Sequence, residues 1–212
     1  MPWYNSVHIG LLTLIWIVIG YNFKSIARER YYWMLFFITY TITEIASIPV
    51  SEYYENNLWL YSVSRPIQFL FVLIYILQAL NVPQQQKRLL IVAGTIVGGL
   101  LLFTQPLNGF NSLEQVIFGA IITIACALYF NRMILSDNPV ALSKTEFWYV
   151  ASLFVFYAIS LCVCGSIDYL MEKDRPLSVR LFYLLIIESY ILYVMTSYAL
   201  LARYPLKKSR RW

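Results

Sequence analysis

Several polar and ionisable side chains occur inside stretches of this sequence that are otherwise apolar. A charge within the hydrocarbon of a bilayer costs a few kcal/mol or more, so such a residue usually faces an interior cavity and marks a ligand site or an ion pathway. Together these side chains could bind a polar ligand or exchange protons. The candidates for such a pocket are His8, Glu44, Arg65, Gln68, Glu114, Asp168 and Glu188, with Gln115 beside them.

These candidates are predicted to gather in one half of the membrane. From a helical rise of about 1.5 Å per residue, depths of roughly 9–15 Å below the same surface are expected for Glu44, Arg65, Gln68 and Glu188. Shallower positions, within about one turn of that surface, are expected for His8, Glu114 and Asp168.

Helical phase places many of these residues on shared faces. In residues 58–80, a helical spacing aligns Tyr61, Ser64, Arg65, Gln68 and Tyr75. Residues 147–170 align Tyr157, Ser160, Cys164 and Asp168, and residues 33–50 align Tyr40, Glu44 and Ser47. Such stripes favour a polar interior lining that is open toward the outside.

Arg65 is expected to carry the main positive charge of this lining. Because an unpaired buried charge is very costly, its expected partner is Glu44 or Glu188, which leaves at least one carboxylate over. The alternative interpretation is a structural ion pair that fixes helix packing. In that case Glu114 and Asp168 would simply be in contact with water.

Seven apolar stretches are long enough to position these residues on membrane-spanning helices, each of which needs roughly 20 mostly apolar residues. The 212-residue chain is 60% hydrophobic and 13% charged, with a mean hydropathy of +0.63, and is therefore far more apolar than a soluble domain. We predict an all-α membrane protein with one transmembrane domain over residues 1–212. Its helices are expected at about 5–23, 33–50, 58–80, 89–105, 113–131, 147–170 and 181–202.

The distribution of lysine and arginine predicts the orientation of these helices. Most basic residues fall in connections on one side, so the N-terminus is expected outside and the C-terminus in the cytoplasm. This bias accounts for most of the net charge of +5 and indicates no nucleic-acid partner. Trp33 and Trp148 are expected in the aromatic belt at the inner interface. The tail 203–212 either anchors the last helix or contacts anionic lipid head groups through Arg203, Lys207, Lys208, Arg210 and Arg211.

Prolines and glycines indicate how the helices pack. Pro49 and Pro66 lie near the outer ends of their stretches, where each could bend a helix and release a carbonyl group. Residues 89–105 contain no ionisable side chain and carry Gly94 and Gly98, a spacing that allows close helix approach. That spacing serves packing within the chain or a homo-oligomer.

A weak similarity relates the first three and the last three predicted helices. Gln68 followed by Ala79–Leu80 has the same spacing as Glu188 followed by Ala199–Leu200. Small sugar transporters have a parallel 3+1+3 arrangement of this kind. The two interpretations are an internal duplication and a chance match between apolar helices.

The sequence lacks the motifs that mark several common classes of enzyme. With a single histidine, a three-histidine zinc site cannot form, and no HExxH, GxSxG or glycine-rich phosphate loop is present. The three cysteines are interpreted as packing residues, and no cofactor or metal is predicted. A carboxylate-only cation site is disfavoured because Arg65 lies in its midst.

Residues 56–71, which include Arg65 and Gln68, resemble the third helix of small seven-helix integral membrane proteins of bacteria, a group without an assigned activity. Thr43–Glu44 and Asn111–Glu114 resemble them too. The resemblance implies a location in the bacterial cytoplasmic membrane. Our first hypothesis is a non-enzymatic protein whose outward-facing polar pocket serves a sensor or an accessory subunit, with membrane lipids and a membrane protein as partners. The alternatives are a small, proton-coupled transporter and a membrane-embedded lipid-modifying enzyme.

Overall fold

The computed structural model describes residues 3–29, 31–54, 57–104, 112–135 and 145–201. These residues form seven α-helices and no strand, which confirms the all-α class. The helices are α1 (Trp3–Glu29), α2 (Tyr31–Tyr54), α3 (Leu58–Ala79), α4 (Gln84–Thr104), α5 (Ser112–Leu135), α6 (Thr145–Lys173) and α7 (Arg175–Leu201). The predicted lipid contacts Arg203, Lys207, Lys208, Arg210 and Arg211 lie outside the described residues.

Six of these helices, α2 to α7, are long and apolar enough to cross a membrane. In α1 the apolar part described is shorter, Val7–Tyr21. The helices extend beyond the predicted apolar stretches, most clearly where residues 171–180 were predicted to form a connection. There α6 and α7 are separated by Asp174 alone, whose carboxylate accepts a hydrogen bond from the backbone N–H of Leu177 at 3.0 Å. This N-terminal cap starts α7 within polar sequence that hydropathy does not register as helix.

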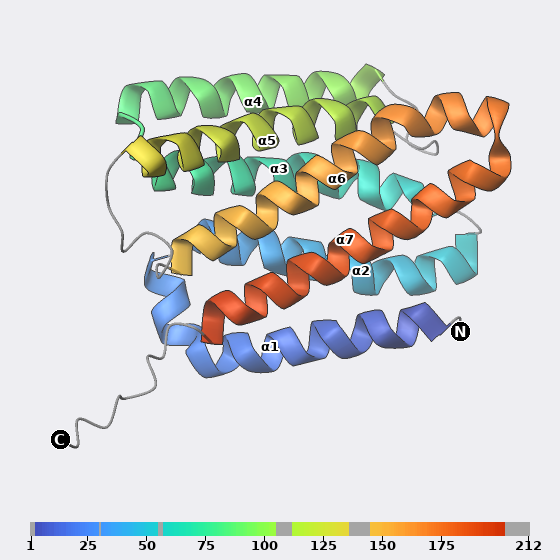
Figure 1. The fold of residues 1–212 in the computed structure, drawn as a ribbon, viewed down its shortest axis with the longest axis horizontal. Coiled ribbons are helices and arrows are strands. Elements are labelled where there is room, and N and C mark those ends of the chain that lie inside the picture. Colours follow the sequence, from blue (N-terminus) through green and yellow to red (C-terminus); the bar gives the residue numbers. More distant parts are fainter. Residues whose placement is uncertain (1–2, 30, 55–56, 105–111, 136–144, 202–212) are drawn as a thin grey trace.

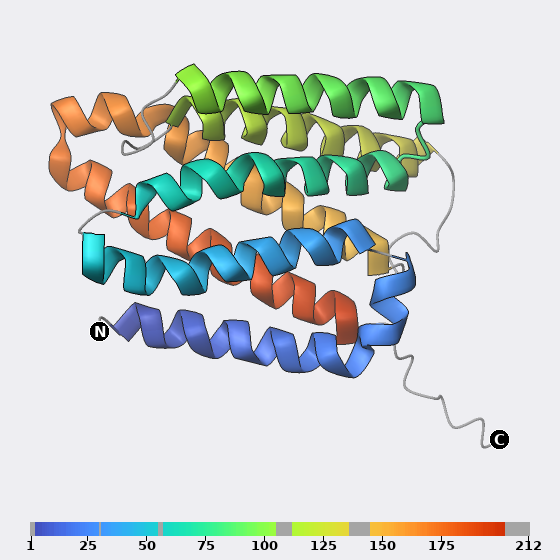
Figure 2. The same ribbon diagram turned by 180° about the vertical axis from the view of Figure 1, so that it is seen from behind.

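Six helices form a closed ring. Each of α1, α2, α3, α5, α6 and α7 contacts the next in this order, and α7 contacts α1. Helix α4 packs against α3 outside the ring (Figures 1 and 2). Its apolar window is only 17% buried, compared with 39–44% in the other five candidate spans. Most of α4 therefore presents its side chains to the surroundings of the bundle.

Two glycines bring α4 close to the ring. A Cβ atom on Gly94 would lie 3.0 Å from Leu73 and 3.3 Å from Phe69, and one on Gly98 would lie 3.4 Å from Pro66. The spacing thus serves packing against α3 within the chain, as small residues do between membrane helices. The predicted homo-oligomer through the same glycines stays a prediction.

Replacing Gly94 by valine is expected to lower the free energy of unfolding by about 1–3 kcal/mol, because the larger side chain must displace α4 or the residues of α3. Gly99→Val on the same helix is the matched control, since a Cβ there meets nothing within 4 Å. Denaturant titration in mixed micelles measures both variants. Equal losses of stability would show that the effect comes from helix propensity and not from packing.

An aromatic block closes the ring on the side where α2 and α6 begin. It consists of Trp33, Phe37, Tyr149 and Tyr193, all at most 1% exposed. Trp33 packs on Tyr149 with ring centroids 4.5 Å apart and stacks on Phe37 at 5.4 Å. The prediction of Trp33 in a lipid-facing aromatic belt is therefore wrong. Its position near a helix end suits a belt, but the phase of α2 turns it into the core.

Candidate functional site

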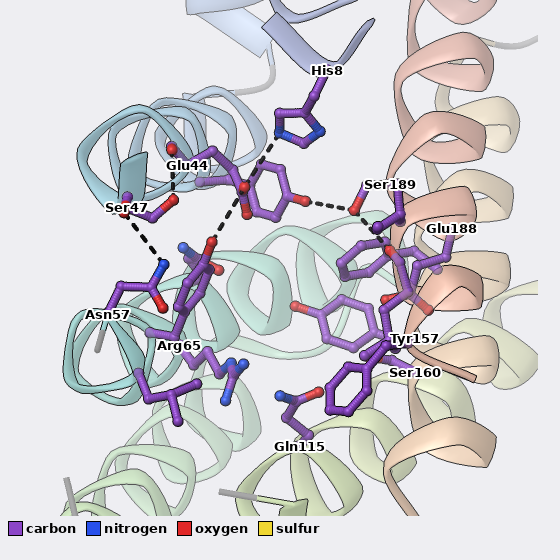
Figure 3. A pocket seen from close by; sticks show the side chains of 18 of the residues that line it. His8, Glu44, Ser47, Asn57, Arg65, Gln115, Tyr157, Ser160, Glu188 and Ser189 are labelled. Atoms are coloured by element: carbon purple, nitrogen blue, oxygen red, sulfur yellow. Dashed lines mark hydrogen bonds and ion pairs between the residues drawn. The ribbon is translucent and has the colours of Figure 1, made fainter. Parts of the chain in front are cut away.

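A cavity of about 630 Å³ lies in the other half of the ring. Its walls come from the starts of α1, α3, α5 and α7 and from the later turns of α2 and α6. Five of the seven predicted pocket residues line it: Gln68 and, labelled in Figure 3, His8, Glu44, Arg65 and Glu188. His8 and Glu188, which are 180 positions apart in the sequence, thus share one polar cavity.

Glu44 and His8 form the first polar cluster of this cavity. Oε2 of Glu44 lies 3.2 Å from Nε2 of His8 and accepts a hydrogen bond from the Tyr61 hydroxyl at 3.3 Å. The same histidine nitrogen lies 3.2 Å from the hydroxyl of Tyr193, which joins this cluster to the aromatic block. Glu44 is therefore held by neighbours from α1 and α3, and the charge of the pair depends on whether His8 is protonated.

Arg65 is held from α5. An orientation of the Gln115 amide with its oxygen toward the guanidinium group places that oxygen 2.8 Å from Nη1 and 2.5 Å from Nη2. Among the carboxylates, Glu114 interacts with Arg65 most strongly and Glu44 more weakly. The guanidinium carbon also lies 5.4 Å from the ring centroid of Tyr61. The sequence had pointed to Glu44 or Glu188 as the main partner.

Glu114 is 1% exposed, so the interpretation that leaves it in contact with water is wrong. It lies in the first turn of α5 and does not line the cavity, where the next residue, Gln115, takes its place. Asp168 behaves in the opposite way. It is exposed, accepts a hydrogen bond from the Ser112 hydroxyl and does not line the cavity.

Glu188 has the least satisfied carboxylate in the cavity. Its side chain is 3% exposed, and the hydroxyl of Ser160 is its hydrogen-bond partner. Its other oxygen, Oε2, is buried and meets no hydrogen-bond donor among the described residues. A buried carboxylate oxygen without a donor is costly, so this atom calls for a ligand, a proton or a water molecule.

Gln68 and α7 complete the lining. The Gln68 amide is 7% exposed and donates to the Thr43 hydroxyl at 3.3 Å. Sequence reasoning missed Ser189, which lines the cavity, and Tyr193, which contacts His8, although Ser189, Tyr193 and Thr196 follow a helical spacing that would have identified a polar face. In the structure Ser189 lies 2.9 Å from the Tyr40 hydroxyl and joins α7 to α2.

Within the described residues, no three His, Cys, Asp or Glu side chains come together as a metal site would require. No protein-family model matches the chain, and no curated protein or solved structure shows significant similarity to it. The fold and site therefore define a class and no family. The chain is a multi-pass helical bundle of the membrane type, with a polar cavity in one half and an aromatic block in the other.

Proposed function

We propose that this protein spans a bacterial cytoplasmic membrane seven times, with its N-terminus and the cavity on the outer side. The bias of basic residues toward one set of connections supports this orientation. The residues that line the cavity come from the helix ends opposite to these basic connections, and under the proposed orientation those ends lie on the outer side. Under this arrangement the cavity is reached from outside and the aromatic block faces the cytoplasmic half.

The proposed function is to bind a small polar molecule from outside, as a sensor or as an accessory subunit of a membrane complex. The observation that carries this proposal is the buried Glu188 carboxylate in a cavity of about 630 Å³. One of its oxygens, Oε2, accepts no hydrogen bond from the described residues. Cavities of roughly 300–1,000 Å³ are typical of sites for small organic ligands. We propose that the bound state is passed on to a partner protein in the membrane.

A small transporter is the second candidate, and the order of the ring favours it. Exchanging α1–α3 for α5–α7 maps every neighbouring pair of the ring onto another neighbouring pair. The corresponding residues Gln68 and Glu188 both line the cavity. These features fit a parallel 3+1+3 repeat around a central site, which is an arrangement of secondary transporters.

Cysteine labelling tests the proposed orientation and separates the two functions. In a variant with Cys126, Cys162 and Cys164 replaced by alanine, Ser51→Cys at the cavity is expected to react with a membrane-impermeant thiosulfonate added outside the cells. Thr196→Cys, at a position that is 0% exposed, is expected to stay unmodified from either side in a sensor. Labelling of Thr196→Cys from the cytoplasmic side would favour the transporter, and labelling of Ser51→Cys from that side alone would contradict the orientation.

A further inference from the structure

We infer that the molecule bound in this cavity is a small organic amine, whose ammonium group is held by Glu188. This inference rests on the proposed binding function and names its ligand class. An ammonium group brings up to three N–H donors and a positive charge. Both are what a buried carboxylate with an oxygen that lacks a donor requires.

The distribution of charge around the cavity singles out Glu188. Glu114 interacts electrostatically with Arg65, and Oε2 of Glu44 lies 3.2 Å from Nε2 of His8. The hydrogen-bond partner of Glu188 is the hydroxyl of Ser160, which carries no charge, and Arg65 acts on Glu188 only electrostatically. The cavity and the wall behind it together hold the carboxylates of Glu44, Glu114 and Glu188. Only Arg65 and a protonated His8 are placed to match them, and a cationic ligand restores the balance.

The walls next to Glu188 suit an organic cation. Tyr157 lies beside Ser160 and Glu188 in Figure 3, and Phe156, Phe182 and Tyr190 also line the cavity. The face of an aromatic ring attracts a cation within about 6 Å of its centroid. Aromatic walls also bury the apolar body of a ligand, so the combination of rings and a carboxylate fits an arylalkylamine.

Two other ligand classes fit less well. An anion would have to bind next to Arg65, whose guanidinium group already donates hydrogen bonds to the side-chain oxygen of Gln115. Three carboxylates within electrostatic reach of the cavity would also repel an anion. A divalent cation needs several oxygen ligands on one centre, and the described His, Cys, Asp and Glu residues form no such group. The volume of about 630 Å³ also far exceeds that of an ion.

A matched series of probes tests the ligand class on the purified full-length protein. The amines are 2-phenylethylamine, tyramine and tryptamine, each compared with its alcohol and its carboxylate on the same ring. We expect the amines to raise the thermal unfolding temperature and the other two series not to. Glu188→Gln keeps the size of the side chain but removes its charge, and it is expected to weaken amine binding roughly 10–100-fold.

The control is Asp168→Asn, which removes a carboxylate that is exposed and outside the cavity, and amine binding should be unchanged. Equal stabilisation by alcohols or carboxylates, or an amine effect that survives Glu188→Gln, would overturn the ligand class and leave the binding function standing. If none of the three series raises the thermal unfolding temperature but Ser51→Cys is labelled from outside, the ligand class is wrong and the proposed binding function still stands. If Ser51→Cys is inaccessible as well, the proposed function fails.

Discussion

Replacing Arg65 by methionine is expected to lower the free energy of unfolding by about 3–5 kcal/mol, because it removes the positive charge that acts on the buried Glu114 carboxylate. Glu114 is 1% exposed, so its charge would stay in a medium of low polarity without the guanidinium group that stabilises it. The hydrogen bonds to Gln115 would be lost as well. Denaturant titration in mixed micelles measures the change.

A double-mutant cycle identifies the partner of Arg65. Glu114→Gln alone should also destabilise the protein, whereas Arg65→Met combined with Glu114→Gln should recover about 1–3 kcal/mol relative to the sum of the single variants. The matched cycle with Glu188→Gln should give a smaller coupling energy, because the hydrogen-bond partner of Glu188 is the Ser160 hydroxyl and not Arg65. Additive effects in the Glu114 cycle would contradict the pair and return the role to Glu44 or Glu188.

The fold could be predicted from the sequence because long apolar runs determine it. Each of the seven predicted stretches became a helix, since a bundle of this composition has to satisfy its backbone hydrogen bonds within each segment. The ends of the helices could not be predicted in the same way. Hydropathy falls where polar residues begin, so it predicts that a helix ends there. The cap at Asp174 nevertheless allows helical structure on both sides of it, through most of residues 171–180.

The site could be predicted in part, for a related reason. Position along a helix gives depth, and helical phase gives a shared face, which together predicted that Glu44, Arg65 and Gln68 lie near one another; in the structure all three line one cavity. Neither quantity says which neighbour covers a given turn. Glu114 and Asp168 were predicted at similar depths, but α5 turns Glu114 into the bundle while α6 turns Asp168 outward. That difference arises from tertiary packing alone.

Trp33→Ala is expected to cost about 3–5 kcal/mol of unfolding free energy, as for other large-to-small changes in a packed core. Trp33 is 1% exposed and packs on Tyr149 and Phe37, so the variant leaves a void in the middle of the aromatic block. Trp33→Phe should cost less. It keeps a ring in place and removes a buried indole N–H that finds no acceptor in the part of the chain described here.

Trp59→Ala is the control for this substitution, because Trp59 is 38% exposed and lies at the opposite end of the bundle. If Trp33→Ala cost no more than Trp59→Ala, Trp33 would not be a core residue.

The Trp33→Ala variant also tests whether the protein is a sensor or a transporter. A sensor can keep the aromatic block closed, whereas a transporter has to open it between α2, α6 and α7. Proteoliposomes with Trp33→Ala that pass arylalkylamines faster than the unmodified protein would therefore identify this block as the barrier between the cavity and the opposite end of the bundle.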